Sequence, residues 1–434
     1  MADVIYDAVV VGAGFAGVTA ARNLVDQGRS VVLLEGGNRV GGRTYARPFA
    51  GHEHITVQLG GSWINRDLQP QMRAEIARYG ARLTEDLMPM SPAFITGGLR
   101  RTFPVPPEEI GDLERVLGHL RDASKRFAPS HRLSSQPLHD LDISVDDFLA
   151  PIGVGPATRD LVYSTVSWCY GSDPGSASIF AMIAQIAAFG HSAYGFFGAL
   201  TERFTGGAGE LLDRMIEGSR LEVRLGHRVV QVERSDDELV VRTTHGASIR
   251  ARACVMAIPT NVLRNVDFRP GLSDDKQRML ARDHLGNLCK PSMLVRNIPS
   301  RPFTLGLGRL QSLCLGYEYE DGTCLMMGFG NRAGIDDPTS REELEGAVRE
   351  YYPDAEVLAV DVHDWKNDPL FNGTHHVDRP GDSLQFLKTM GELEGRIVFA
   401  GTDVADTVWR AWMEGAMQSG QNATTAVHSL LARS

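Results

Sequence analysis

A glycine-rich turn near the N-terminus constrains the fold of this chain more than any other feature. Residues 8–11 are a continuous apolar run, which is typical of a parallel strand buried on both faces. Gly12, Gly14 and Gly17 follow in the spacing Gly-x-Gly-x-x-Gly and open an amphipathic helical pattern. The first glycine permits a tight turn, the second lets a pyrophosphate approach the backbone, and the third lets helix and strand pack closely. The sequence therefore predicts a dinucleotide at the N-terminus of this helix.

A second buried strand, residues 30–34, ends at Glu35, about 20 residues beyond the glycine turn. An acidic side chain at this place accepts hydrogen bonds from the hydroxyls of a ribose. The same acid repels a 2′-phosphate, so NADP is disfavoured. The fingerprint by itself does not distinguish NAD from FAD.

Length and composition narrow the class of protein. A chain of 434 residues exceeds the size of roughly 250–300 residues at which single cores stop growing, so two domains are expected. The formal net charge of −10 argues against nucleic acid as a partner. The longest apolar stretch, residues 178–189, is shorter than the roughly 20 residues that span a bilayer. Five scattered cysteines without metal-ligand spacing favour a reducing compartment. We therefore expect a cytoplasmic protein without metal or membrane partner.

The rest of the chain alternates between helical and strand patterns. Residues 70–205 are predicted to be mostly helical, and residues 291–330 to form strands. Further strands are predicted at 221–225, 229–232, 239–242, 249–257 and 397–400, and helices at 341–352 and 413–431. Elements of nucleotide-domain type thus occur at both ends and in the middle of the chain, and a site between two domains is expected.

Later glycine motifs favour FAD over NAD. Gly41-Gly42-Arg43-Thr44 can meet a phosphate and a flavin ring, and Gly60-Gly61-Ser62-Trp63 offers bare backbone beside a flat ring. Near the C-terminus, a strand leads into Gly401-Thr402-Asp403, and Trp412 precedes a helix that starts at Met413. A helix N-terminus aimed at the flavin would stabilise negative charge on the reduced ring.

Together with the turn at residues 206–211, these motifs resemble the flavin-containing amine oxidase family, which includes monoamine oxidase. Residues 34–37, 363–365 and 368–371 resemble in particular the bacterial members that oxidise 6-hydroxynicotine. The resemblance implies an α/β fold: a Rossmann-like FAD-binding domain with an inserted α+β substrate domain. We expect the FAD-binding domain at 1–70, 206–288 and 391–434, and the substrate domain at 71–205 and 289–390.

The resemblance also assigns site residues. Val229 matches the family position whose backbone meets adenine, and Lys290 matches the lysine that holds a water at flavin N5. Alternatively, Val229 is a plain buried strand residue and Lys290 is a lysine at the edge of a strand, with no role at a cofactor. The expected cofactor-binding set is Gly12, Gly14, Gly17, Glu35, Gly42, Arg43, Gly60, Gly61, Ser62, Trp63, Val229, Gly401, Asp403 and Met413.

The chain departs from the family where two aromatic rings usually stand over the flavin. One ring is kept as Trp412, although the loop before it is about one residue longer than usual. The other position holds His375, with His376 adjacent, so a one-residue slip would exchange their roles. The histidine is either a satisfied core residue or a group that binds a polar substrate or takes up a proton. Thr374 stands where covalent members place cysteine, so FAD is expected to bind non-covalently.

Aromatic residues of the inserted segments could line an apolar substrate cavity, although each taken singly is more commonly a core residue. The candidates are Trp168, His191, Tyr194, Phe197, Tyr317 and Phe329.

The function expected is oxidation of a C–N bond in a small, cyclic or N-alkyl amine, with O₂ as the second substrate and hydrogen peroxide as product. Lys290, His375 and Trp412 are the expected catalytic residues. The altered aromatic pair keeps open the alternative of a flavin-dependent C–C desaturase acting on a cyclic substrate. A flavoprotein without turnover is a third class, against which Lys290 and the helix start at Met413 argue. A homodimer is also left open.

Overall fold

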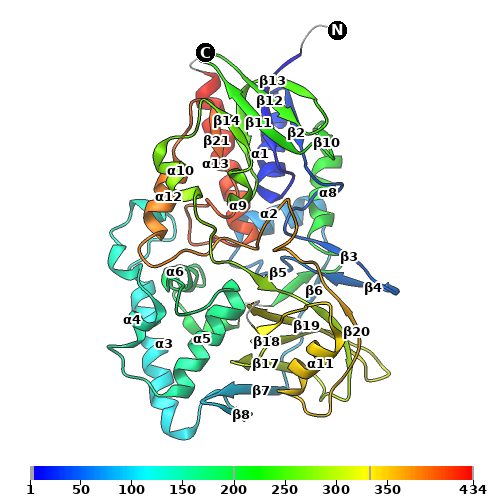
Figure 1. Cartoon of the computed structure of the whole chain (residues 1–434), viewed down its shortest axis with the longest axis vertical. Helices are drawn as coiled ribbons and strands as arrows, with labels where there is room; N and C mark the ends of the chain where they lie inside the picture. Colours follow the sequence, from blue (N-terminus) through cyan, green and yellow to red (C-terminus); the bar gives the residue numbers. More distant parts are fainter. Residues whose placement is uncertain (1–3, 199–200, 332–333, 433–434) are drawn as a thin grey trace.

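The computed structural model describes residues 4–198, 201–331 and 334–432. An eight-stranded sheet forms one end of the molecule, near both termini (Figure 1). Its parallel core has the order β10-β2-β1-β13, with β21 also on β13. The bounds are β1 (Ile5–Val11), β2 (Val31–Leu34), β10 (Glu222–Arg224), β13 (Ser248–Met256) and β21 (Ile397–Phe399); β11 (Val229–Arg234), β12 (Leu239–Thr243) and β14 (Asp267–Arg269) extend the sheet beyond β13.

Helices cover both faces of this sheet because its strands are apolar on both sides. Val10 and Leu33 point into one core, against α1, α2, α8 and α13, while Val9 and Leu34 point into the other, against α9, α10 and α12. The helices are α1 (Phe15–Asp26), α2 (Pro70–Tyr79), α8 (Gly209–Glu217), α9 (Thr260–Leu263), α10 (Asp274–Leu280), α12 (Ser383–Gly391) and α13 (Met413–Leu431). The expected Rossmann-like arrangement is confirmed.

A second eight-stranded sheet occupies the opposite end, beside a group of helices (Figure 1). Its order is β20-β16-β19-β18-β17-β7-β8, with β15 also on β19. The strands are β7 (Ser91–Thr96), β8 (Leu99–Arg101), β15 (Leu288–Cys289), β16 (Ser292–Arg296), β17 (Pro302–Gly306), β18 (Ser312–Glu318), β19 (Cys324–Asn331) and β20 (Glu356–Asp361). The helices are α3 (Ile110–Ser124), α4 (Val145–Leu149), α5 (Pro156–Tyr170), α6 (Phe180–Ala188), α7 (Ala193–Phe197) and α11 (Arg341–Arg349), with short 3₁₀ turns η1 (Pro107–Glu109), η2 (Leu133–Ser135) and η3 (His139–Leu141).

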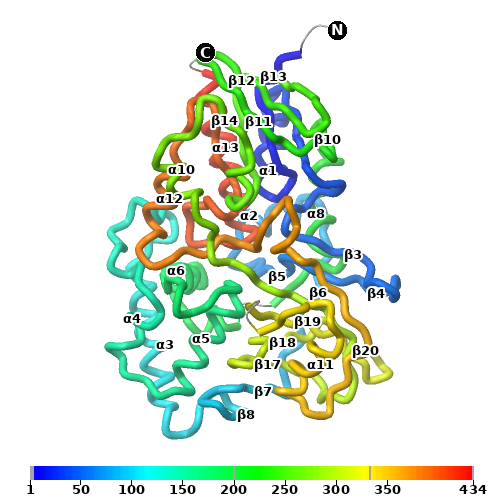
Figure 2. Tube along the Cα trace, in the orientation of Figure 1, coloured from blue at the N-terminus to red at the C-terminus, as the bar shows by residue number. Residues whose placement is uncertain are grey.

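Two small sheets lie between the large ones. One is the hairpin of β3 (Ala46–Phe49) and β4 (His52–Gln58), and the other joins β5 (Trp63–Ile64), β9 (Glu202–Phe204) and β6 (Leu83–Glu85). Residues 70–205 are therefore less helical than expected, because β6, β7 and β9 find their partners far along the chain. The tube in Figure 2 shows the N-terminal and C-terminal segments side by side in the upper part of the molecule, where α1 packs on α13.

The five cysteines, all in the described part of the chain, carry free thiols. Among the helices described, none combines the length and the apolar character needed to cross a membrane.

Candidate active site

A large cavity runs from the glycine turn after β1 to the strands of the second sheet. It holds about 1610 Å³ of space free of protein atoms, its mouth included. Sixteen of the residues expected from the sequence line it: Gly12, Gly14, Glu35, Gly42, Arg43, Gly60, Gly61, Ser62, Trp63, Val229, Lys290, Phe329, His375, Gly401, Trp412 and Met413. Residues from the N-terminal, central and C-terminal parts of the chain thus meet around one space.

The glycine turn at one end of the cavity depends on missing side chains. Gly17 lies outside the cavity lining, and a Cβ on it would come 1.8 Å from the carbonyl oxygen of Gly12, so this glycine lets α1 pack on the turn. A Cβ on Gly14 would meet no protein atom within 4 Å, because this glycine faces open space. Gly14 is also the N-cap of α1 and makes no side-chain cap bond, so the first N–H groups of the helix stay available to an anion.

Glu35 lies at the same end and is oriented by backbone hydrogen bonds. One carboxylate oxygen accepts from the N–H of Ala13 at 2.8 Å, and the other from the N–H of Gly37 at 2.8 Å. Each oxygen keeps a further lone pair, so the carboxylate can also accept from ligand hydroxyl groups.

Arg43 is held at the centre of the cavity wall. Its Nη1 donates to Asp403 Oδ1 at 2.8 Å and to the Thr374 carbonyl at 2.6 Å. Although burial alone would raise it, the positive charge of Arg43 holds the pKa of Asp403 well below its usual range. Asp403 lies outside the cavity lining and orients Arg43 through this hydrogen bond.

Lys290 lies at the other end of the cavity and is 4% exposed. Its Nζ donates to the Gly60 carbonyl at 2.6 Å and to Ser62 Oγ at 2.8 Å, and lies 4.9 Å from the centre of the Trp63 ring. Burial, helped by the positive charge of Arg203, lowers the pKa of Lys290 to about 7. This amine therefore exchanges between its two protonation states near neutral pH.

His375 and Trp412 complete this end, and His375 rather than His376 lines the cavity. Burial lowers the pKa of His375 to about 4, so the imidazole is neutral at physiological pH. Its Nε2 is buried, and no side chain or backbone group in the described structure hydrogen-bonds to it. Trp412 packs on Phe189 with ring centres 5.6 Å apart, and Ala411 before it adopts a left-handed conformation with φ 71°. This strained residue turns the long preceding loop into α13.

Comparison with known proteins identifies the family. The family model for flavin-containing amine oxidoreductases matches residues 15–428. The chain belongs to this family. It is therefore an oxidoreductase, as the motifs around the cavity indicated.

Among curated relatives of this flavin-containing amine oxidoreductase, (S)-6-hydroxynicotine oxidase of Paenarthrobacter nicotinovorans is 31% identical over 97% of this chain and 99% of its own. Nicotine dehydrogenase of Pseudomonas putida is also 31% identical, over 98% of this chain and 89% of its own. A structure of putrescine oxidase, 20% identical, superposes with a TM-score of 0.88 over 98% of this chain and 100% of that one. Cyclohexylamine oxidase of Brevibacterium oxydans, 22% identical, gives a TM-score of 0.84 over 99% and 100% of the two chains. The two structural likenesses establish the fold.

The cavity of this amine oxidoreductase fits a flavin dinucleotide. Gly14 and Gly401, at which a Cβ would meet no protein atom within 4 Å, leave bare backbone along open space. The uncapped start of α1 and the start of α13 at Met413 both face the cavity, where their N–H groups can meet negative charge.

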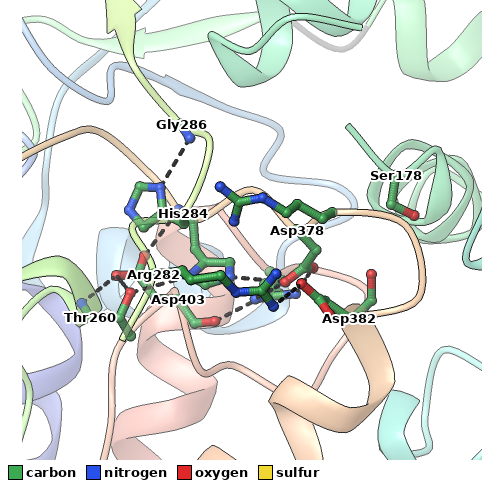
Figure 3. A network of polar contacts seen from close by, with 12 residues as sticks. Ser178, Thr260, Arg282, His284, Gly286, Asp378, Asp382 and Asp403 are labelled. Atoms are coloured by element: carbon green, nitrogen blue, oxygen red, sulfur yellow. Dashed lines mark hydrogen bonds and ion pairs between the residues drawn. The ribbon is translucent and has the colours of Figure 1, made fainter. Parts of the chain in front are cut away.

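His376 belongs instead to a buried polar network with Thr260 and Asp378, which are labelled in Figure 3. Its Nε2 lies 2.9 Å from Asp378 Oδ1, its Nδ1 lies 3.2 Å from the Thr260 hydroxyl, and Arg410 donates to Asp378 at 2.5 Å. Thr260 also donates its backbone N–H to Asp403 at 3.1 Å. The network connects Arg43, through Asp403, to the loop before Trp412, and so it fixes the cavity wall from behind.

The expected substrate-pocket residues divide into two groups. Phe329 lines the cavity, and Trp168 packs in the same cluster just behind it. The other four lie outside the cavity lining: Tyr194 is 81% exposed, Tyr317 is 58% exposed, His191 Nδ1 contacts Ser124, and Phe197 packs on Phe196. Tyr194 and Phe197 lie on α7 and Tyr317 lies on β18, while His191 precedes α7.

Several lining residues were not expected as site residues. Trp365, Leu370 and Phe371 line the cavity together with Leu288 and Thr374. Trp365 donates its indole N–H to the Leu59 carbonyl at 2.9 Å. The similarity of residues 363–371 to the 6-hydroxynicotine-oxidising members was a signal that could have placed them at the site.

Proposed function

We propose that this chain is an FAD-dependent oxidase that acts on a C–N bond of a small, cyclic or N-alkyl amine. The cavity lined by Gly12, Gly14, Glu35, Arg43 and Lys290 would hold FAD, which would supply a two-electron acceptor for the hydride of the amine α-carbon, and O₂ would take up those electrons with two protons as hydrogen peroxide. The observation that carries the proposal is one continuous cavity that joins the glycine turn and Glu35 to Lys290, His375 and Trp412.

The walls around Lys290 favour the neutral form of an amine. An alkylammonium ion has a pKa of about 10 and lacks the lone pair that drives C–H cleavage. Glu35 is the one carboxylate among the described lining residues, so no other lining side chain offers a negative charge to a bound cation. Trp63, Phe329 and Trp412 instead exclude water there, which lowers the pKa of a bound amine.

Two side chains at this end can handle protons. Lys290, with a pKa of about 7, can take up or release a proton at the cavity wall. His375, neutral with a pKa of about 4, can accept a hydrogen bond from a polar group of the substrate. These roles, and those of the cofactor-binding residues, are part of the proposal.

Non-covalent attachment of FAD is part of the proposal as well. Thr374 lines the cavity, and its hydroxyl accepts a hydrogen bond from the Leu288 N–H at 3.1 Å. No cysteine occurs among the described lining residues. Acid precipitation should therefore release all of the yellow cofactor into the supernatant.

We also propose that the FAD-binding domain comprises residues 1–70, 206–288 and 391–434, and that the substrate domain comprises residues 71–205 and 289–390. The free thiols fit a cytoplasmic location. A homodimer is to be tested by the hydrodynamic mass of the purified protein.

Anaerobic flavin reduction across a substrate panel tests the function. Cyclic and N-alkyl amines should bleach the flavin absorbance, and admission of O₂ should restore it with release of peroxide. Saturated cyclic ketones, which a C–C desaturase would use, should leave the spectrum unchanged. Bleaching by ketones alone, or by no compound of the panel, would contradict the proposal.

A further inference from the structure

The small sheet of β5, β9 and β6 lies beside the cavity and brings the side chains of Trp63, Arg203 and Asp86 together. Trp63 on β5 is directly paired with Arg203 on β9, and Arg203 is paired on its other side with Thr84 of β6. Asp86 follows β6 directly. This sheet therefore gathers an aromatic ring of the cavity wall, a cation and an acid.

Both carboxylate oxygens of Asp86 accept hydrogen bonds from neighbouring side chains. Its Oδ2 accepts the indole N–H of Trp63 at 2.5 Å, and its Oδ1 accepts Nε of Arg203 at 2.5 Å. Arg203 also donates to the Gly316 carbonyl at 2.8 Å. The side chains of Arg203 and Asp86 are 11% and 15% exposed, so solvent screens the pair only weakly.

Trp63 in turn lies close to two cations. The guanidinium carbon of Arg203 lies 5.9 Å from the centre of its ring, and Nζ of Lys290 lies 4.9 Å from the same point. The hydrogen-bond acceptors of Lys290, the Gly60 carbonyl and the Ser62 hydroxyl, are both neutral. Within the described part of the chain, both hydrogen-bond acceptors of Lys290 are thus uncharged.

The charged groups that act on Lys290 are few. The positive charge of Arg203 lowers the pKa of Lys290, and Arg203 is itself ion-paired with Asp86. Burial raises the pKa of the nearby Cys314 to about 12, so its thiol is neutral. Burial is thus the main cause of the lowered pKa of Lys290, and the charge of Arg203, the ion-pair partner of Asp86, is the next.

We propose that Asp86 and Arg203 form a positioning pair that fixes the Trp63 indole and sets the charge that Lys290 experiences. Neither residue lines the cavity, so both act through Trp63 and Lys290. The importance of this pair for catalysis rests on the proposed amine oxidation. Its electrostatic coupling to Lys290 is independent of that function.

Substitutions of Arg203 and of Asp86 should shift the pKa of Lys290 in opposite directions. Arg203→Met removes the neighbouring positive charge and leaves Asp86 unpaired, so the pKa of Lys290 should rise by about one unit. Asp86→Asn keeps an acceptor for Trp63 but leaves Arg203 uncompensated, so the pKa of Lys290 should fall by a similar amount. The double variant should return close to the wild-type value.

A lysine-specific titration measures this directly. The chain has five lysines, so protein labelled with ¹⁵N at lysine Nζ gives at most five side-chain signals, and Lys290→Met identifies the one of interest. The titration is recorded on the folded protein with FAD. Shifts of opposite sign in Arg203→Met and Asp86→Asn support the proposal, while shifts of the same sign, or none in both, overturn it.

Matched variants separate coupling from general damage. Arg234 and Glu394 form a pair with 12% and 10% exposed side chains, and neither lines the cavity, so Arg234→Met should leave the Lys290 titration unchanged. Arg203→Lys keeps the charge and should hold the pKa near the wild-type value. If Arg203→Met fails to fold, the nearly isosteric Asp86→Asn decides by itself: a lowered pKa supports the pair and an unchanged one overturns it.

The enzyme assay is a separate readout. In the loaded protein, the pH dependence of flavin reoxidation should move with the lysine titration. Absence of amine oxidation by the wild type, with the opposite NMR shifts intact, would overturn the proposed function and leave the coupling standing. Amine oxidation by the wild type without those NMR shifts would overturn the electrostatic coupling and leave the proposed function standing.

Discussion

Two helical glycines differ sharply in what a methyl group would meet. A Cβ on Gly17 of α1 would lie 1.8 Å from the Gly12 carbonyl oxygen, whereas one on Gly118 of α3 would meet nothing within 4 Å. Gly17→Ala must push α1 off the turn, so we expect loss of FAD binding and a lower melting temperature. Gly118→Ala should raise stability by about 0.5–1 kcal/mol, because alanine favours the helix. Flavin absorbance and thermal unfolding of both variants check the contrast.

His375 should act as a neutral group throughout the working pH range, because its pKa of about 4 lies far below neutrality. His375→Phe keeps a ring but removes the polar atoms. We expect kcat/KM for hydrogen-bonding amines to fall about 5-fold to 150-fold, which corresponds to the roughly 1–3 kcal/mol of a lost buried hydrogen bond. The pH profiles of variant and wild type should run parallel between pH 6 and 8. An inflection near pH 6.5 that vanishes in the variant would contradict a neutral His375.

Site residues were predictable where a motif constrains the backbone. Gly12, Gly14 and Glu35 follow from one strand–turn–helix pattern, and the structure brings them together at the cavity. Tyr194 and Tyr317 were chosen by residue type alone, and they point to solvent. Their direction depends on the register of α7 and β18, which a local pattern does not reveal.

Among secondary-structure elements, those with local signals were predictable. The helix expected at 413–431 is α13, and the strands expected at 229–232 and 239–242 appear as β11 and β12. β7 was missed because it contains a proline and pairs in parallel with β17, more than two hundred residues away. The pairing partner, rather than the segment itself, makes it a strand.

Glu414 of α13 caps the N-terminus of a different helix, α2. It lies on α13 with 0% exposure, and its carboxylate accepts the backbone N–H groups of Gln71 at 3.2 Å and Met72 at 2.9 Å in the first turn of α2. Gln69, the N-cap of α2, makes no side-chain cap bond of its own. Glu414→Ala leaves these buried donors unpaired, so we expect a loss of about 1–3 kcal/mol in the free energy of unfolding.

Two variants serve as references for this cap. Glu414→Gln keeps one acceptor oxygen and should lose less than Glu414→Ala. Ser340→Ala removes the local cap of α11, where the hydroxyl accepts the Glu343 N–H, and should cost about 1 kcal/mol. Urea unfolding measures all three, and a smaller loss in Glu414→Ala than in Ser340→Ala would contradict the capping role.

At the scale of the whole molecule, the cavity exists only when distant segments are in place. Gly14, Arg43, Lys290 and Trp412 line one space although they come from both ends and the middle of the chain. A ligand that binds only this assembled state stabilises it by mass action. The buried polar network that contains Thr260, Asp378 and Asp403 also joins segments that are far apart in the sequence (Figure 3). Its titratable groups are therefore buried only when these segments are in place.

These buried histidines make the whole fold sensitive to acid. Burial lowers the pKa of His375 to about 4 and also lowers the pKa values of His376 and His284. Between pH 6.5 and about 4 the unfolded chain therefore binds more protons than the folded one, so stability falls as pH falls through this window. For His375 alone, the loss on going from pH 7 to pH 5 is about 2 kcal/mol.

Thermal unfolding of the flavin-bound protein at pH 7, 6 and 5 measures this loss. His375→Phe cannot titrate at this position, so its melting temperature should decline less steeply with acid than that of the wild type. Asp378 and Asp403 do not enter the same window, because their cationic neighbours hold both pKa values well below the usual range despite burial. Equal declines in variant and wild type would mean that His375 is not buried in its neutral form, and the cavity wall would then be wetter than the described packing allows.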